Sequence, residues 1–179
     1  LNDQERDALQ KIAFLWSKDE KKVSDFYTVK VSENSGQFNI SSGETVAIFR
    51  YIKGGRILGI EIGPSGLFEG IIKSVDLRIT WDGEENPAVY CPLADFFGYA
   101  FGKASMQSLL MGTRGEVNYC YFPMPFDKSA TVELINRKNS SSSENPPQVN
   151  VRVFYSDEKR DPRKEGKFYT YWNKITKSI

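Results

Sequence analysis

The sequence predicts a single all-β domain, a jelly-roll β-sandwich with a short N-terminal helix. From residue 26 onward the hydrophobic period is two, and β-branched and aromatic residues dominate between turn signals. A helical pattern occurs only in the first 22 residues, so no helices are expected to cross between strands. The chain has 179 residues, of which 40% are hydrophobic, enough to build one core. Antiparallel sheets closed as a sandwich satisfy all three observations.

The helix is predicted over residues 2–22. Asn2 and Glu5 have the spacing of a capping box at its start. Apolar side chains then recur at helical spacing, namely Leu9, Ile12, Ala13 and Trp16. We therefore expect residues 1–22 to form a helix that packs this apolar stripe onto a jelly-roll domain of residues 23–179.

Nine segments are predicted to be strands. The clearest is 74–82, where Val75, Leu77, Ile79 and Trp81 alternate with polar residues, as in a strand with one wet face. Trp81 is accordingly expected in the core. The other predicted strands are 26–32, 45–52, 56–62, 88–91, 116–122, 130–137, 149–156 and 167–172.

The composition argues against several classes of function. Lys and Arg number 24 against 23 Asp and Glu, a net charge of +1, so no nucleic-acid partner is expected. No apolar run approaches the roughly 20 residues that cross a bilayer, and no membrane partner is expected. The start carries no export signal, but removal of a signal stays open because the chain begins at Leu1.

The absence of histidine bears on catalysis and metal binding. It excludes Ser-His-Asp and Cys-His chemistry within this chain. Two cysteines alone cannot complete a tetrahedral zinc site, and we expect no metal or cofactor. Cys91 and Cys120 lie on predicted strands among apolar and aromatic residues. Buried free thiols are the favoured interpretation, with a disulfide as the alternative.

Candidate site residues gather in two stretches, 81–102 and 118–126. The carboxylates Asp82, Glu84 and Glu85 surround a turn signal, so solvated turn residues are favoured over a catalytic pair or a calcium loop. Asp95 lies between Leu93 and an aromatic pair, where a carboxylate must be paired, hydrogen-bonded or functional. It either holds backbone amides at a strand corner or faces a ligand.

The substrate-binding residues that we predict are polar or aromatic. Aromatic residues in the second stretch suit either sugar stacking or core packing. The predicted set is Asp95, Phe96, Phe97, Asn118 and Tyr121.

Three segments, in this order, resemble a bacterial glycoside hydrolase family: DGEENPAVYCPLADFFGYAFG, NYCYFPMPFDKSATVELINR and FYTYWNK. Characterised members of this family include a difructose dianhydride synthase/hydrolase and exo-acting D-arabinofuranosidases. The resemblance covers residues 57–172, and its most specific parts are residues 95–98 and 121–126. It implies two jelly rolls in each subunit, assembly as trimers or multiples of trimers, and retaining hydrolysis by two glutamates.

The sequence departs from the family in its catalytic motifs. In the family both glutamates lie in the second jelly roll, in an Glu-Gly-Asp-type strand and a Gly-Thr-Glu-Asp-type run. Neither motif occurs here, since Glu69-Gly70 and Glu165-Gly166 continue differently. The family's substrate-lining Ser-Tyr-Asp-Arg-type segment also cannot be recognised in residues 26–38. The chain therefore resembles the first jelly roll only, and no catalytic residue can be carried over.

Two functions follow as hypotheses. In the first, the chain is the N-terminal half of a glycoside hydrolase acting on furanosides, with Asp95 and nearby aromatics at a carbohydrate site. A second jelly-roll domain or another subunit of a trimer-based homo-oligomer would complete that site. In the second, a jelly roll without catalysis binds carbohydrate or forms a shell.

Overall fold

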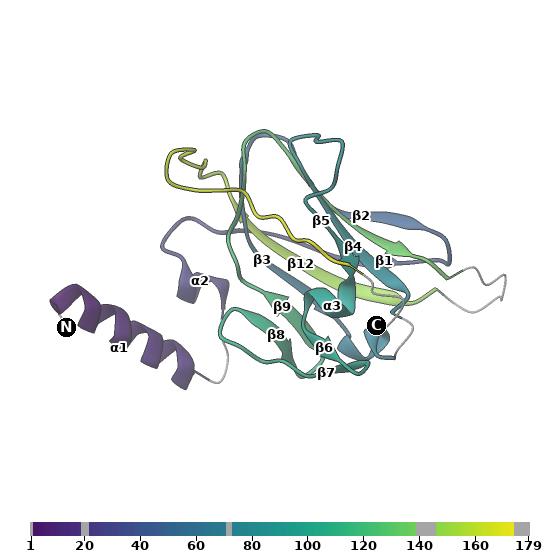
Figure 1. Cartoon of the computed structure of the whole chain (residues 1–179), viewed down its shortest axis with the longest axis horizontal. Coiled ribbons are helices and arrows are strands. Elements are labelled where there is room, and N and C mark those ends of the chain that lie inside the picture. The colour runs from purple at the N-terminus through teal and green to yellow at the C-terminus, as the bar shows by residue number, and fades with distance from the viewer. Residues whose placement is uncertain (1, 19–21, 71–72, 139–145, 174–179) are drawn as a thin grey trace.

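Two antiparallel sheets face each other in the computed structural model, which describes residues 2–18, 22–70, 73–138 and 146–173. The first sheet holds, in order, β1 (Ser32–Asn39), β12 (Gln148–Ser156), β3 (Gly55–Gly63), β9 (Val117–Cys120) and β8 (Met111–Arg114), and β10 (Met124–Phe126) pairs with β3. The second holds β2 (Thr45–Tyr51), β11 (Ala130–Asn136), β4 (Val75–Trp81) and β5 (Val89–Pro92). The predicted sandwich with an N-terminal helix is confirmed (Figure 1).

Short elements complete the architecture. β6 (Tyr99–Ala100) and β7 (Lys103–Ala104) pair with each other. A 3-10 turn (Ser65–Phe68) follows β3, and α3 (Leu93–Phe96) follows β5 directly. None of the helices in the described part of the chain has the length and apolar composition that crossing a bilayer requires.

The core lies between the two sheets and confirms the placement of Trp81. Its side chain has no exposed surface and stacks on Phe126, with ring centroids 5.9 Å apart. Its indole Nε1 donates a hydrogen bond of 2.7 Å to the carbonyl oxygen of Phe168. Cys91 and Cys120 are buried free thiols, as predicted. Burial raises the pKa of each thiol to about 12.

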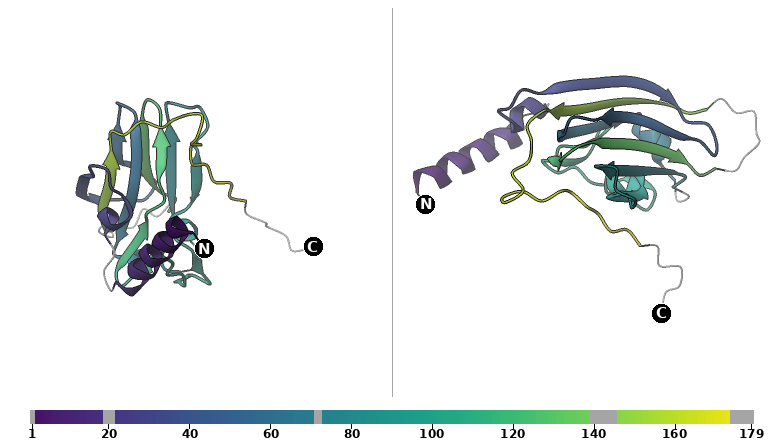
Figure 2. Two further views of the ribbon diagram at one scale, coloured as in Figure 1. Left: turned by 90° about the vertical axis from the view of Figure 1, so that its left-hand side faces the viewer. Right: turned by 90° about the horizontal axis from the view of Figure 1, so that it is seen from above.

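The helix α1 (Asp3–Ser17) has the predicted capping box, but its packing was predicted wrongly. Leu9, Ile12 and Trp16 are 50%, 44% and 57% exposed, and Leu15 is the one buried residue of this helix. Figures 1 and 2 show α1 projecting from one end of the sandwich. The adjoining face of the first sheet is instead covered by α2 (Val23–Phe26), whose Val23 packs against Leu58, Tyr119, Tyr121 and Phe154.

Two predicted strands are irregular segments in the structure. Residues 26–32 enter β1 only at Ser32, and the Tyr27 hydroxyl donates to the carbonyl of Tyr121 at 2.6 Å. In 167–172 the backbone of Thr170 donates to Ala88, and no ladder forms along the described residues of this segment. Their apolar side chains pack on the sandwich without strand pairing, which sequence alternation alone cannot distinguish from a strand.

Candidate functional site

The structure separates the predicted site residues into three places. Asp95 and Phe96 line a groove beside the C-terminal segment. Phe97 and Asn118 lie inside the sandwich with no exposed surface. Tyr121 lines a different cavity, on the outer face of the first sheet.

Asn118 holds the β8–β9 hairpin to its surroundings. Its Oδ1 accepts hydrogen bonds from the Thr113 hydroxyl at 2.7 Å and from the Tyr99 hydroxyl at 2.9 Å. Its Nδ2 is buried without a hydrogen-bond partner among the described residues. These bonds join β8, β9 and β6, and Met111 of β8 is one of the residues that line the groove.

Asp95 is held by side chains and not by backbone amides. One carboxylate oxygen pairs with Lys73 Nζ, and the other accepts a hydrogen bond of 3.0 Å from Trp172 Nε1. The interpretation in which its carboxylate caps amides at a strand corner is therefore wrong. The cause is local: α3 follows Pro92 directly and turns the carboxylate toward the C-terminal segment.

The groove beside Asp95, hereafter the Asp95 groove, has a volume of about 220 Å³. Three of its aromatic side chains are exposed: Tyr171 (91%), Trp172 (41%) and Phe122 (37%). Phe97 packs edge-on behind Phe96, with ring centroids 5.1 Å apart. The lining residues are Cys91, Asp95, Phe96, Met111, Phe122, Phe168, Thr170, Tyr171 and Trp172. Aromatic faces beside an oriented carboxylate can bind a ring that has an apolar face and hydroxyl groups.

Asp82 has the amide-capping role that was considered for Asp95. Its carboxylate accepts hydrogen bonds from the backbone amides of Asp127, Lys128 and Ser129 and pairs with Lys167 Nζ at 2.5 Å. Burial opposes ionisation, yet the hydrogen bonds from Lys167 and the three amides lower the pKa of Asp82 to about 2. The expectation of a solvated Asp82 is wrong, because the 127–129 turn closes over a side chain that is only 8% exposed.

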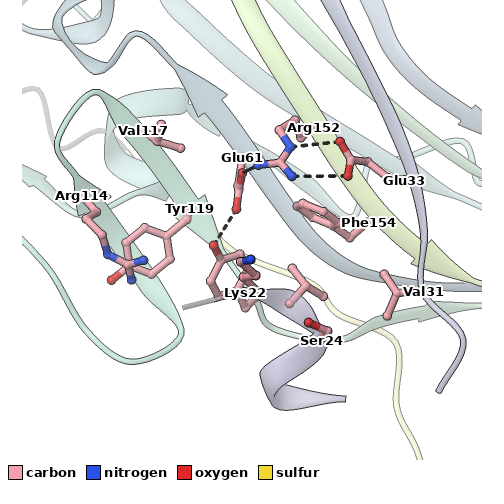
Figure 3. Close-up of a pocket in the computed structure, with 12 residues that line it drawn as sticks. Lys22, Ser24, Val31, Glu33, Glu61, Arg114, Val117, Tyr119, Arg152 and Phe154 are labelled. Carbon is pink, nitrogen blue, oxygen red and sulfur yellow. Dashed lines mark hydrogen bonds and ion pairs between the residues drawn. The ribbon is translucent and has the colours of Figure 1, made fainter. Parts of the chain in front are cut away.

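A larger cavity, hereafter the outer cleft, lies on the outer face of the first sheet and has a volume of about 520 Å³ (Figure 3). Side chains from β1, β3, β8, β9 and β12 reach it, together with residues at the start of α2. The lining residues are Lys22, Val23, Ser24, Val31, Glu33, Glu61, Arg114, Val117, Tyr119, Tyr121, Arg152 and Phe154.

Arg152 joins two carboxylates across the outer cleft, as the dashed lines of Figure 3 mark. Its Nε and Nη2 donate to Glu33 at 3.0 and 3.3 Å, and its Nη1 donates to Glu61 at 3.0 Å. Glu61 also accepts a hydrogen bond of 2.6 Å from the Tyr121 hydroxyl. Burial and the neighbouring Glu61 raise the pKa of Tyr121, so this hydroxyl stays protonated as a donor.

Gly59 of β3 lies under three of the side chains that line the outer cleft. A Cβ atom at Gly59 would lie 2.8 Å from Val23 Cγ2, 3.0 Å from Tyr121 Cδ1 and 3.2 Å from Phe154 Cδ2. Because side chains of α2, β9 and β12 meet over this position, any larger residue would push them apart.

Arg114 stands at the β8 side of the outer cleft without a carboxylate. Its guanidinium carbon lies 4.9 Å from the ring centroid of Tyr119. Its Nε and Nη2 are buried and have no hydrogen-bond partner among the described residues. Leaving charged donors buried without acceptors is costly.

The charged residues of the outer cleft were not predicted from the sequence. Glu33, Glu61, Arg114 and Arg152 come from four different strands, and only strand pairing brings them together. One signal was present: Glu61 is the only carboxylate in the otherwise apolar run of β3 after Arg56. A lone carboxylate in such a strand must have partners.

Comparisons with known proteins give one family and distant matches among solved structures. A comparison with curated proteins found no match. Solved structures similar to this chain include the acidic stable capsid of Helicobacter pylori bacteriophage KHP30, at 8% identity and a TM-score of 0.42, covering 70% of this chain and 86% of that chain. Another is the infectious bursal disease virus VP2 subviral particle, at 13% identity and a TM-score of 0.36, covering 70% and 31%.

The family model described as GH172 domain-like matches residues 30–149, more than half of the chain. This match confirms the resemblance inferred from the three sequence segments. The chain therefore belongs to the GH172 domain-like family, the family of difructose dianhydride synthases and arabinofuranosidases.

Proposed function

We propose that this chain is the sugar-binding, non-catalytic jelly-roll half of a glycoside hydrolase that acts on furanosides. Residues 23–179 form the jelly-roll domain, and the catalytic glutamates come from a second jelly-roll domain or another subunit. Membership of the GH172 domain-like family supports this assignment. The sequence also lacks both of the glutamate motifs expected of the catalytic half.

The chemistry of the outer cleft supports a non-catalytic role. Retaining hydrolysis requires two carboxyl groups about 5 Å apart, one of which is kept protonated. Glu33 and Glu61 instead both bind the guanidinium of Arg152, and Glu61 also accepts the Tyr121 hydroxyl. The two carboxyl groups are therefore engaged by other side chains of the cleft and do not form a free catalytic pair. We expect no turnover of an aryl furanoside by this chain.

The Asp95 groove is the proposed furanoside site. The observation that carries it is the Asp95 carboxylate, which side chains of Lys73 and Trp172 fix at the wall of an aromatic groove. A furanose ring would stack its C–H face on Trp172 or Phe96 and donate hydroxyl hydrogen bonds to Asp95. Phe97 and Asn118 support this wall from inside the sandwich.

The test is titration of this chain with methyl arabinofuranoside and methyl fructofuranoside. Asp95→Asn should weaken furanoside binding by about tenfold or more, because charge-assisted hydrogen bonds are lost. The free energy of unfolding of Asp95→Asn, measured in urea, should stay within about 0.5 kcal/mol of the parent value, because both partners of Asp95 are partly exposed side chains. Glu85→Gln, at an exposed turn, is the matched control. Unchanged affinity in Asp95→Asn would remove the groove from the proposal.

Assembly with further copies of this chain is part of the proposal. The observation that favours it is the projecting helix α1, whose Leu9 and Ile12 are half exposed. We expect trimers in sedimentation, and we expect the double change Leu9→Glu and Ile12→Glu to shift them to monomers. A parent protein that sediments as a monomer at all concentrations would contradict this part of the proposal.

A further inference from the structure

We propose that the outer cleft binds a second ligand, a saccharide that carries a carboxylate group, with Arg114 as the anchor of that group. This site is distinct from the Asp95 groove, since no residue lines both cavities. The inference does not depend on furanoside binding in the groove.

The unused edge of Arg114 is the first argument. The Nε and Nη2 donors of arginine form the edge that binds a carboxylate with two parallel hydrogen bonds. Two other arginines of this chain use it in that way. Arg152 binds Glu33 at 3.0 and 3.3 Å, and Arg160 binds Asp127 at 3.1 and 2.8 Å. In Arg114 the same two nitrogens have no partner among the described residues.

The carboxylates already in the outer cleft are engaged elsewhere. Glu33 and Glu61 bind Arg152, and Glu61 also accepts the Tyr121 hydroxyl. Among the lining residues, Lys22, Arg114 and Arg152 face these two carboxylates, which leaves one excess positive charge. A ligand with a single negative charge balances the cleft.

The position of the Arg114 guanidinium on the Tyr119 ring determines how its Nε and Nη2 donors can reach the carboxylate of the ligand. Nε and Nη2 are covered in the empty protein, so the bound state turns this edge of the guanidinium toward the cavity. This turn needs rotation about the side-chain torsions of Arg114, during which the guanidinium, now 4.9 Å from the Tyr119 ring centroid, can stay within the roughly 6 Å of a cation–π contact. Lys22 lines the same cavity and adds a second cation.

The rest of the cleft suits hydroxyl groups better than a protein segment. Glu61, Glu33 and Arg152 keep lone pairs and N–H groups that can bind hydroxyls, and Phe154 and Val117 offer apolar surface. A concave cavity of about 520 Å³ is of the size that small-molecule sites have. Its floor at Gly59 is closed by side chains on three sides. These features favour a small polyhydroxy acid over an acidic peptide.

The experiment compares methyl galacturonoside with methyl galactoside, which lacks the charge, by titration of the full chain. The acid should bind at least about tenfold more tightly, and added salt should weaken it. Arg114→Gln should reduce the affinity for the acidic sugar to the affinity for the neutral sugar. Arg114→Lys should also lose most of the preference for the acidic sugar over the neutral sugar, because lysine keeps the charge but lacks the two-donor edge. Arg163→Gln is the matched control, since the Arg163 side chain is 88% exposed and lies outside the cleft.

In the comparison of ligands and Arg114 variants, four results would overturn the inference. They are equal affinity for acid and neutral sugar, parent affinity in a folded Arg114→Gln, acetate binding as tightly as the acidic sugar, and an acidic peptide binding more tightly than the sugar. Asp95→Asn separates the two sites: it should weaken furanoside binding by about tenfold or more and leave binding of the acidic sugar unchanged. Loss of both ligands in Asp95→Asn would contradict a separate site in the outer cleft.

Discussion

At the scale of single residues, Asp82 ties two chain segments to the end of β4. It follows Trp81 with a positive φ of 59°, a backbone conformation that aspartate tolerates better than most residues. From there its carboxylate reaches the 127–129 turn and Lys167 of the C-terminal segment. The side chain thus connects the strand end, the turn before β11 and the segment that leads to the Asp95 groove.

Asp82→Ala should lower the free energy of unfolding by about 1–3 kcal/mol, because it removes a charged acceptor of three backbone amides and the partner of Lys167. Urea unfolding measures this, and Glu85→Ala on the same turn should stay within about 0.5 kcal/mol of the parent. An equal effect of the two changes would show that the capping bonds contribute nothing to stability.

The pH dependence of stability gives a second readout of Asp82. The pKa of Asp82 falls from 3.8 to about 2 in the folded protein. At pH values between these two, the folded state therefore binds fewer protons than the unfolded chain. The stabilisation by this carboxylate is therefore complete above pH 4 and is lost as the pH falls from 4 toward 2. Asp82→Asn should flatten the stability profile in that window, and an unchanged slope would contradict the assignment.

At the scale of elements, β4 links the core to the C-terminal segment through Trp81. Trp81→Ala should cost about 3–5 kcal/mol, because it removes a fully buried ring that stacks on Phe126. Trp81→Phe keeps an aromatic ring but loses the hydrogen bond to Phe168, so it should cost less. Tyr171→Ala, at a side chain 91% exposed, is the control. A loss below 1 kcal/mol for Trp81→Ala would contradict the core assignment.

Elements with strict alternation were predictable from the sequence, and elements fixed by tertiary contacts were not. The sequence of β4 alternates over its whole length, and burial follows this alternation from Leu77 to Trp81, because one face of these residues is core. Asp76, at the start of the strand, is buried and pairs with Arg137. Residues 26–32 and 167–172 carry similar apolar residues, but they pack on the sandwich without strand pairing: Tyr27 packs on the cluster of the outer face and Phe168 against the core between the sheets. The apolar residues of α1 lie at helical spacing and the helix forms as predicted. No sequence pattern states which surface such a stripe contacts.

At the scale of the whole molecule, strand order decides which predicted site residues meet. Asp95, Phe97 and Tyr121 lie in two motif-rich segments of the sequence, but in the fold they lie in a groove, in the interior and at the outer face of the first sheet. Glu61 and Arg152 become neighbours because β3 pairs with β12, with these two residues in register. Family membership was predictable because it depends on contiguous segments, whereas both cavities depend on non-local pairing.

The central claim, that a furanoside binds beside Asp95, is tested most directly by the indole N–H signals of the three tryptophans in an NMR titration. Trp172 donates its indole N–H to Asp95 inside the groove, whereas Trp81 is buried in the core and Trp16 lies on α1. Methyl arabinofuranoside should move the Trp172 signal in a saturable way and leave the Trp81 and Trp16 signals unchanged. A Trp172 signal that stays in place at saturating sugar would contradict the claim.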